Sequence, residues 1–365
     1  MSDKFDIAVV GAGIAGASIA AELGAHARVV LLEAEDRPGY HSTGRSAAFW
    51  AESYGGPLVQ PLTTASGAWL DEHGFLGPRS GLHIARAGQE QATEHFMAEF
   101  ASAGVHVEWQ DRAGLESFVP GFRPEWTHGV YEPDCKDIDV AGVHAWYLAE
   151  AKRVGVALRV RAGLRAAQHG PDGWTLATAD GARIRCATLV NAAGAWADPV
   201  AELAGVRPVG IQPLRRTIVQ LRTAPVPVQT MPLVIDIGEE FYFKPEHGSL
   251  WLSPHDETPT PPVDAAPEEL DVAIAIDRFE HAVDWQVERV EHKWAGLRSF
   301  APDRLPVYGP DHGNPAFFWF AGQGGFGIQT APAAARLAAQ VLLGLSSDGL
   351  TAAIDRDRYL AARFG

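Results

Sequence analysis

The feature that most constrains this chain is a glycine-rich turn close to its N-terminus. An apolar stretch at residues 7–10 runs into Gly11, Gly13 and Gly16, and a second apolar stretch ends at Glu33. This spacing is typical of a strand, a tight turn, a helix and a second strand that together bind a dinucleotide. Gly11 would permit the turn, Gly13 would let the backbone approach a pyrophosphate, and Gly16 would let the helix lie against the sheet. The N–H groups at the start of that helix would face the phosphates.

Glu33 narrows the choice of dinucleotide. An acid at the end of the second strand accepts hydrogen bonds from ribose hydroxyls and repels a 2′-phosphate. The pattern therefore favours FAD or NAD over NADP. A glycine-rich turn that binds nothing is the alternative, and the acid in register makes it the weaker interpretation.

Size and charge limit the classes of function. The chain has 365 residues, of which 47% are hydrophobic, enough for two domains or one large discontinuous one. A net charge of −15 argues against nucleic acid and anionic membranes as partners. The N-terminal apolar run follows Asp3, Lys4 and Asp6 and contains three glycines. We therefore expect neither a signal peptide nor a membrane span there.

Cysteine and histidine usage gives no sign of a metal centre. Cys135 and Cys186 are the only cysteines in the sequence, which fits a reducing compartment and predicts a cytoplasmic protein. The run His255, Asp256, Glu257 has metal-binding side chains, but it lies in a polar, proline-rich stretch. We expect a solvated loop there and no metal.

Two further segments repeat the pattern of an apolar strand that enters a turn of small residues. One covers residues 187–198, and the other covers residues 317–330 and opens a helix over 331–343 that Gly344 ends. Because ligands bind at the carboxyl ends of strands in open α/β sheets, the three turns could converge on one ligand.

The segments between these turns have another character. Residues 140–154 and 267–282 predict helices, and short alternating runs predict strands over 156–160, 173–177, 182–186, 217–222, 240–244 and 250–252. We expect a mixed α/β and α+β fold, in which a discontinuous Rossmann-like domain combines with a mainly antiparallel substrate-binding domain. The predicted boundaries are 1–80, 136–210 and 295–365 for the first domain, and 81–135 and 211–294 for the second.

Four separated motifs, in order along the chain, carry a family resemblance. They are residues 38–48 (PGYHSTGRSAA), 189–196 (LVNAAGAW), 294–300 (WAGLRSF) and 323–330 (QGGFGIQT). The sequence resembles the D-amino acid oxidase and glycine oxidase superfamily of FAD-dependent enzymes over nearly its full length, and within it the bacterial D-arginine dehydrogenases. The resemblance implies oxidative deamination of a D-amino acid to a 2-oxo acid and ammonia, with hydride passing from the substrate Cα to flavin N5.

The resemblance also implies which residues hold FAD. The attachment should be non-covalent, because the cysteine that sarcosine-oxidase-like relatives use has no counterpart after Cys186. The implied FAD contacts are Gly11, Gly13, Ile14, Ala15, Gly16, Glu33, Ala34, His41, Ser42, Thr43, Arg45, Ser46, Ala47, Ala48, Gly163, Leu164, Ala193, Gly194, Trp196, Gly324, Gly325, Gly327, Ile328 and Gln329.

The resemblance places the substrate carboxylate on two arginines. Arg298 matches a bidentate carboxylate clamp, a task that suits guanidinium geometry. Arg216 matches a second contact, although its neighbour Arg215 could exchange with it. Tyr242 and Tyr54 match tyrosines that reach the substrate. Gly325 would lie against the flavin beside them.

The side-chain pocket departs from the D-arginine dehydrogenase pattern. Gly81 stands where that group has a glutamate that holds the cationic side chain, and Phe49 stands in place of a histidine. An unpaired guanidinium would be costly to bury in such a pocket. We therefore expect a preference for neutral or apolar side chains, with Phe49, Trp50 and Gly81 at the pocket. Glu52 could replace the missing acid, but we interpret it as an exposed loop residue.

Several alternatives stay open from the sequence. Glycine, sarcosine, a secondary amine such as proline, or a 2-hydroxy acid would also present a carboxylate to Arg298. A nucleotide-binding protein without turnover or an NAD-dependent subunit is a further possibility, which the third glycine turn disfavours. Either oxygen or a quinone could reoxidise the flavin.

Overall fold

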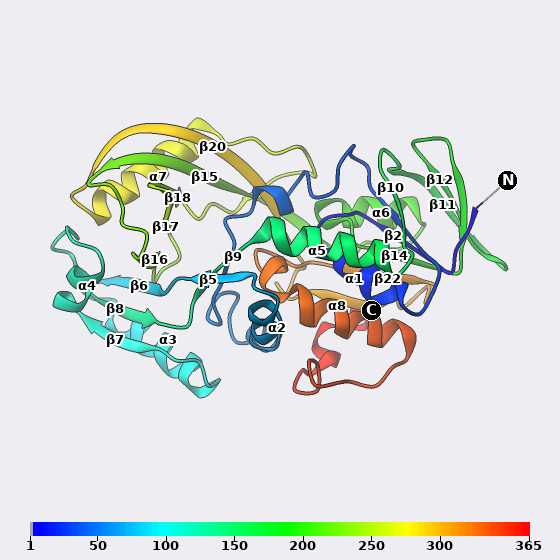
Figure 1. The fold of residues 1–365 in the computed structure, drawn as a ribbon, viewed down its shortest axis with the longest axis horizontal. Coiled ribbons are helices and arrows are strands. Elements are labelled where there is room, and N and C mark those ends of the chain that lie inside the picture. The colour runs from blue at the N-terminus through cyan, green and yellow to red at the C-terminus, as the bar shows by residue number, and fades with distance from the viewer. Residues whose placement is uncertain (1–2) are drawn as a thin grey trace.

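The computed structural model describes residues 3–365, which form an elongated molecule built around two large sheets (Figure 1). A six-stranded sheet lies towards the N-terminus in this view, and a nine-stranded sheet lies at the opposite end. A small three-stranded sheet joins them, made of β4 (Phe49–Trp50), β9 (Lys136–Ile138) and β5 (Leu76–Pro78). This mixed architecture agrees with the expected fold class.

The six-stranded sheet is parallel except at one edge. Its order is β10-β3-β2-β14-β22-β21, and β21 alone runs antiparallel to its neighbour. The central strands are continuous apolar runs because helices or sheets cover both of their faces. The strands are β2 (Ile7–Val10), β3 (Val29–Leu32), β10 (Ala157–Arg159), β14 (Thr188–Asn191), β21 (Val307–Pro310) and β22 (Phe317–Ala321).

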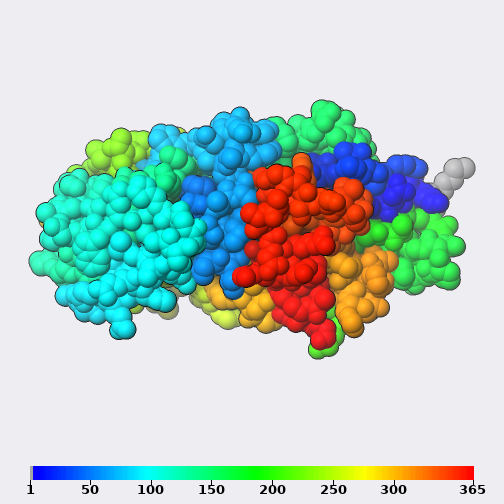
Figure 2. Space-filling model, turned by 90° about the horizontal axis from the view of Figure 1, so that it is seen from below, coloured from blue at the N-terminus to red at the C-terminus, as the bar shows by residue number. Residues whose placement is uncertain are grey.

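Helices cover one face of this sheet. The first helix, α1, packs between α5 and α8, and α2 packs on the outside of α8. Their bounds are α1 (Ile14–Gly24), α2 (Gln60–Glu72), α5 (Val140–Arg153) and α8 (Gly327–Leu343). Seen from below, the C-terminal residues lie on the surface beside α2 (Figure 2).

Helix α8 begins four residues before the predicted start at 331. The Thr330 hydroxyl donates to the Phe326 carbonyl, so the first turn closes ahead of Pro332. The predicted end is correct, because Gly344 adopts φ 68° and its N–H bonds to the Gln340 carbonyl.

The opposite face of the six-stranded sheet is covered by a four-stranded sheet and α6 (Ala197–Leu203). The four strands, in the order β1-β13-β12-β11, pack on a hydrophobic core that includes the fully buried Trp174. Their bounds are β1 (Asp3–Lys4), β11 (Leu164–Gly170), β12 (Gly173–Thr178) and β13 (Arg183–Cys186).

The nine-stranded sheet is antiparallel except where β16 pairs with β6. Its order is β19-β15-β18-β17-β16-β6-β8-β7, and β20 pairs with β15. The strands are β6 (Gly81–Arg86), β7 (Glu108–Asp111), β8 (Trp126–Glu132), β15 (Gln212–Ala224), β16 (Leu233–Asp236), β17 (Tyr242–Glu246), β18 (Ser249–Ser253), β19 (Thr258–Pro259) and β20 (Gln286–Phe300).

Helices α3 (Glu90–Ser102), α4 (Arg112–Phe118) and α7 (Glu269–Ala282) accompany this sheet, and α7 buries Val272, Ala275 and Phe279 against it. The long pair β15–β20 leads from this sheet to the six-stranded one, where β20 ends. Short 3-10 turns lie at Thr43–Arg45, Gly194–Trp196, Arg356–Tyr359 and Ala361–Phe364. Among residues 3–365 no helix is long and apolar enough to span a membrane.

Candidate active site

A cavity of about 460 Å³ runs from the carboxyl ends of the parallel strands to the β15–β20 pair. This volume is typical of small-molecule sites. All three glycine-containing turns reach it: Gly11 and Gly13 after β2, Ala193 and Gly194 after β14, and residues 323–327 after β22. The three strand ends therefore converge on one cavity, as their shared sequence pattern predicts.

The first turn has no room for side chains. Gly11 has φ 97°, and a Cβ on it would lie 2.6 Å from the Ala192 carbonyl oxygen. A Cβ on Gly16 would lie 1.6 Å from the Gly11 carbonyl oxygen. Gly16 thus lets α1 close against the turn, and it does not itself line the cavity. At Gly11 the cavity wall therefore consists of backbone, which leaves it open to a close ligand.

Glu33 is buried at the end of β3, and both of its oxygens have backbone partners. The Ala12 N–H donates to Oε2 at 2.8 Å and the Glu35 N–H donates to Oε1 at 3.0 Å. These bonds fix the carboxylate at the cavity wall. Each oxygen retains a lone pair, so the group can still accept a hydroxyl from a ligand.

His144 supports the same turn and was missed by the sequence analysis. Its Nε2 lies 2.9 Å from the Ala12 carbonyl oxygen, and its ring packs beneath Gly39, where a Cβ would lie 2.7 Å from Cε1. Burial lowers the pKa of His144, so the neutral ring donates its Nε2 proton to the carbonyl. The amphipathic spacing of α5 gives no hint that one of its side chains reaches a turn far away in the sequence.

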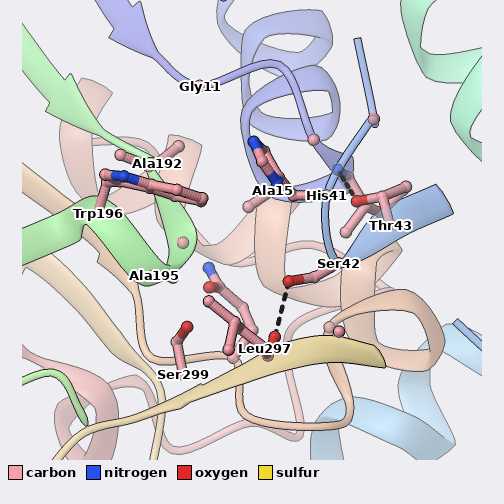
Figure 3. Close-up of a pocket in the computed structure, with 18 of the residues that line it drawn as sticks. Gly11, Ala15, His41, Ser42, Thr43, Ala192, Ala195, Trp196, Leu297 and Ser299 are labelled. Atoms are coloured by element: carbon pink, nitrogen blue, oxygen red, sulfur yellow. Dashed lines mark hydrogen bonds between the residues drawn. The ribbon is translucent and has the colours of Figure 1, made fainter. Parts of the chain in front are cut away.

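The middle of the cavity is lined by the segment after β3 and by the turn after β14 (Figure 3). The Ser42 hydroxyl donates to the Leu297 carbonyl at 2.6 Å, and the Ile14 N–H donates to the Thr43 hydroxyl at 3.0 Å. The rings of His41 and Trp196 lie 4.5 Å apart. The segment is thereby fastened to both the first helix and the strand β20.

Arg45 lines the cavity, but its guanidinium group is already engaged. It donates to the Ala265 and Ala295 carbonyls at 2.9 Å and 3.1 Å, and it pairs with Asp264. Its expected contact with the cofactor would therefore come from its backbone or its aliphatic stem.

Arg216 and Arg298 lie side by side at the other end of the cavity. They belong to the adjacent strands β15 and β20, where Arg216 pairs with Gly296 and Leu214 pairs with Arg298. Arg216 Nε donates to the Asp256 carbonyl at 2.9 Å, but Nη1 and Nη2 are buried and find no hydrogen-bond partner among residues 3–365. Arg298 Nη1 has one long contact, 3.5 Å to Glu257. Both side chains line the cavity.

Arg215 points to the opposite face of β15, because successive side chains of a strand alternate. Its Nη2 lies 2.9 Å from Asp271, and its Nη1 pairs with Glu268. Arg215 does not line the cavity. Of the two neighbouring arginines, Arg216 is therefore the one that faces the cavity.

Burial depresses the pKa of both cavity arginines. It lowers the pKa of Arg298 to about 9, with a further contribution from the nearby charge of Arg304. Burial likewise lowers the pKa of Arg216. Both groups remain charged at neutral pH, and the fall reflects guanidinium groups removed from water without a full set of anionic partners.

Two tyrosines and a glycine complete this end. The Arg298 guanidinium lies 5.5 Å from the centre of the Tyr54 ring. A Cβ on Gly325 would lie 2.4 Å from the Tyr54 hydroxyl and 2.6 Å from Arg298 Nε. Tyr242 is buried, and Phe49 lies 4.9 Å from Tyr54 and 6.2 Å from Tyr242 between ring centres. These residues form an apolar and phenolic wall around the two guanidinium groups.

The comparisons with known proteins agree on the family. Residues 6–341 match the model of the DAO family, described as FAD dependent oxidoreductase. The chain belongs to this family. It is 24% identical over 416 residues to hydrogen cyanide synthase subunit HcnC of Pseudomonas aeruginosa, covering 100% of this chain and 97% of that protein.

Solved structures of two enzymes share the fold of this DAO-family chain. Glycine oxidase from Geobacillus kaustophilus superposes with a TM-score of 0.84 at 21% identity, covering 98% of both chains. L-proline dehydrogenase from P. horikoshii superposes with a TM-score of 0.85 at 20% identity, covering 100% of this chain and 98% of that one. At 20–21% identity, this similarity shows a shared fold alone.

FAD is the cofactor of the DAO family, and the residues present fit it. The side-chain-free wall at Gly11, the fixed carboxylate of Glu33 and the start of α1 suit a dinucleotide's phosphates and ribose. Apart from Gly16, every residue that the sequence analysis assigned to FAD lines the cavity. Within residues 3–365 neither cysteine lines it.

Two expected pocket residues and one alternative lie elsewhere. Trp50 points away from Phe49 on β4 and packs on α2, where its Nε1 donates to the Thr63 carbonyl at 2.9 Å. Gly81 lies inside the nine-stranded sheet, and a Cβ there would lie 3.4 Å from the Glu132 Cβ. Glu52 is partly buried and bonds to Thr64. None of the three lines the cavity, so the prediction that Trp50 and Gly81 border a side-chain pocket is wrong.

Glu132 is a buried carboxylate that the sequence analysis missed. Its Oε1 accepts the N–H groups of Glu52 and Ser53 at 2.9 Å and 3.3 Å, and its Oε2 accepts the Ser53 hydroxyl at 2.5 Å. It thereby holds the turn that carries Tyr54. A single glutamate at the end of a strand gives no sequence signal of this role.

The expectation of a solvated loop over His255, Asp256 and Glu257 is wrong. Asp256 accepts the Thr217 N–H at 2.7 Å and the Thr217 hydroxyl at 3.0 Å, and its side chain is 7% exposed. Burial lowers the pKa of His255 to about 3. The loop packs against the strand that carries Arg216, because its polar groups find partners on that strand.

Proposed function

We propose that this FAD-dependent oxidoreductase oxidises a D-amino acid with a neutral side chain to a 2-oxo acid and ammonia. The observation that carries the proposal is the pair of adjacent guanidinium groups of Arg216 and Arg298. Arg216 Nη1 and Nη2 are buried without a hydrogen-bond partner in residues 3–365, and Arg298 Nη1 has a single long contact, 3.5 Å to Glu257. Buried donors of this kind are costly unless a ligand satisfies them. A carboxylate does so with the right geometry and charge.

The lining of the cavity supports a neutral side chain. Phe49, Ile218 and Tyr242 surround the arginine end. Within residues 3–365 the acids that line the cavity are Glu33 and Glu35, which lie at the other end of it. A cationic side chain beside the arginines would therefore find no direct partner. The D configuration rests on the resemblance of the four sequence motifs.

The residues of this chain would then act by positioning. FAD, when bound, supplies the acceptor for two electrons. Arg216 and Arg298 would hold the carboxylate, and Phe49 and Tyr242 would confine the side chain. The Cα–H bond breaks as hydride leaves, the C–N single bond becomes an imine, and water hydrolyses that imine to the 2-oxo acid and ammonia. Orientation of this kind accounts for much of a rate enhancement.

A second class of substrate is glycine or a secondary amine. Glycine oxidase and L-proline dehydrogenase share the fold of this chain over nearly its whole length. The same two arginines would hold the carboxylate of glycine, sarcosine or proline. Glycine, sarcosine and proline differ from the proposed D-amino acids in their amine or their side chain. One assay with a panel of single compounds can therefore distinguish the two substrate classes.

The test is anaerobic mixing of the purified holoenzyme with single compounds while the flavin absorbance is followed. The panel contains D- and L-phenylalanine, D-methionine, D-leucine, D-arginine, glycine, sarcosine, L-proline and a 2-hydroxy acid. We expect fast bleaching with neutral D-amino acids and slow or absent bleaching with L-forms and D-arginine. Fast bleaching with sarcosine or proline alone would replace the proposal with the second class.

We further propose non-covalent FAD and an acceptor that is either oxygen or a quinone. Acid precipitation should release all of the flavin into the supernatant, and a flavin that stays with the pellet would contradict this. Mixing the reduced enzyme with oxygen or with a soluble quinone then ranks the two acceptors by their reoxidation rates.

A further inference from the structure

Glu257 is surrounded by three guanidinium groups. Its Oε1 lies 2.8 Å from Arg304 Nη2, 3.5 Å from Arg298 Nη1 and 3.6 Å from Arg216 Nη2, and its Oε2 lies 3.0 Å from Arg304 Nη1. Only the contact with Arg304 is a well-formed pair. The two cavity arginines thus share one distant carboxylate oxygen and keep most of their donors free.

The charges around the two cavity arginines balance without a ligand. Asp256 contributes a second carboxylate, with its Oδ1 3.8 Å from Arg216 Nε and its Oδ2 3.9 Å from Arg215 Nε. Arg215 in turn pairs with Glu268 and Asp271 on the far side of the strand. The linked groups are four arginines (Arg215, Arg216, Arg298 and Arg304) and four acids (Asp256, Glu257, Glu268 and Asp271). A ligand carboxylate would therefore be held by the free guanidinium donors and not by a net positive charge.

Glu257 and Arg304 do not themselves line the cavity. Their side chains are 30% and 55% exposed, so they lie on the solvent side of the two buried arginines. They can affect a ligand only through charge and through the arginines. Because Glu257 lies within a few ångströms of the cavity arginines in a partly buried site, the loss of its unit charge would substantially change the affinity of the site for an ion.

We propose that the Glu257–Arg304 pair sets the charge selectivity of the site, so that it accepts one carboxylate and rejects a second. The inference rests on the proposed function only in placing a carboxylate on Arg216 and Arg298. With Glu257 present the cluster carries no net charge, and one carboxylate can use the free donors of Arg216 and Arg298. A second carboxylate then enters an apolar wall with no net positive field to offset its desolvation.

Two substitutions change the balance in opposite directions. Glu257→Gln removes an anion, retains the shape of the side chain and leaves an excess cation near the cavity. Arg304→Gln removes a cation and frees Glu257 to compete for Arg298 and Arg216. Glu268→Gln is the matched control, because it removes the same charge from the neighbouring group around Arg215.

The experiment measures dissociation constants of benzoate and isophthalate with the holoenzyme, by titration of the flavin absorbance and by calorimetry. These probes share one ring and carry one and two carboxylates. We expect Glu257→Gln to tighten benzoate about tenfold and isophthalate more than that, and Arg304→Gln to weaken both about tenfold. Glu268→Gln should stay within about twofold of the parent.

Weaker binding in both variants would overturn the proposal, because it would show that the pair only holds the arginines in place. Unchanged dissociation constants, or a parent protein that binds neither probe, would also overturn it. The titrations require no turnover. If the constants shift as expected while no D-amino acid bleaches the flavin, the proposed function fails and the charge selectivity stands.

Discussion

The two ends of the cavity differ in how far their polar groups are satisfied. Around the first turn, Glu33 accepts two backbone N–H groups, and Thr43 and His144 bond to the backbone beside it. At the other end, Arg216 Nη1 and Nη2 are buried without partners in residues 3–365. At the first end the Glu33 carboxylate is satisfied by the protein and only His41 Nδ1 is buried without a partner in residues 3–365, whereas at the second end a guanidinium group lacks hydrogen-bond partners on two of its nitrogens. This difference matches the proposal that the first end holds the cofactor and the second end binds the substrate carboxylate.

The largest effect that this comparison predicts is at Arg298. We expect Arg298→Met to lower kcat/KM by roughly 100- to 1,000-fold, because the substrate carboxylate loses a charged, buried partner. Arg298→Lys should recover part of the loss, since a lysine keeps the charge but not the paired donors. Steady-state kinetics with the best substrate of the panel gives both values.

The flavin content of the Arg298 variants is the control. It should equal that of the parent, because other residues form the first turn and Glu33, where we propose that the pyrophosphate and adenosine bind. Loss of flavin in step with loss of activity would mean that the two ends are not independent.

Arg216 and Arg215 are neighbours on β15, but only Arg216 of the two lines the cavity, so their variants separate a substrate role from a structural one. We expect Arg216→Met to lower kcat/KM by roughly 30- to 100-fold with unchanged flavin binding. Arg215→Met should leave kcat/KM within about threefold but lower the melting temperature, because Asp271 then lacks its buried partner. The reverse pattern in kinetics would show that the strand register places Arg215 on the substrate.

At the opposite end, Glu33→Gln should weaken FAD about tenfold and leave kcat unchanged at saturating FAD. The amide keeps one acceptor for the Ala12 N–H but loses the charge that strengthens bonds to hydroxyls. Titration of the apoprotein with FAD measures the change. A fall in kcat at saturating FAD would argue against the separation of the two ends.

The smallest effect concerns His144 and pH. Burial lowers its pKa in the folded protein below the ordinary value of about 6.5. The unfolded chain therefore binds more protons as the pH falls below about 6.5, and the stability present above that pH declines by at most about 1.4 kcal/mol per pH unit. In His144→Gln, which keeps a neutral donor, the decline should be shallower.

Chemical denaturation of the holoenzyme between pH 8 and pH 5 checks this difference. Other buried groups titrate identically in both proteins, so the difference between the two curves isolates His144. Parallel curves would show that protonation of His144 is not linked to folding.

The contrast between the two ends of the cavity also explains which parts of the site could be predicted from the sequence. The first turn, Glu33 and the three strand ends follow from local spacing, because neighbours in the sequence build that part of the cavity. The sequence wrongly predicts a solvated loop over His255, Asp256 and Glu257, because the partners of this loop, Thr217 and Arg304, are distant in the sequence.

Side-chain direction was the second limit. The sequence pattern predicts both Phe49 and Trp50 at the pocket, but successive residues of a strand face opposite ways, and of the two only Phe49 lines the cavity. The same alternation along β15 turns Arg216 towards the cavity and Arg215 away from it. It also turns Ile218, two residues after Arg216, towards the cavity. Glu132 and His144 could not be inferred, since each acts on a turn far along the chain.

The pairing of β15 with β20 has a consequence for how such enzymes diversify. The offset of two residues between Arg216 and Arg298 is fixed by the ladder between the strands, and the chain that joins them, residues 225–285, carries Tyr242 and the Asp256–Glu257 loop. Insertions or replacements within that connection can alter what the pocket selects while the two guanidinium groups keep their spacing. If Arg216 and Arg298 hold the substrate carboxylate as proposed, changes in residues 225–285 alter the choice of substrate without displacing the two arginines.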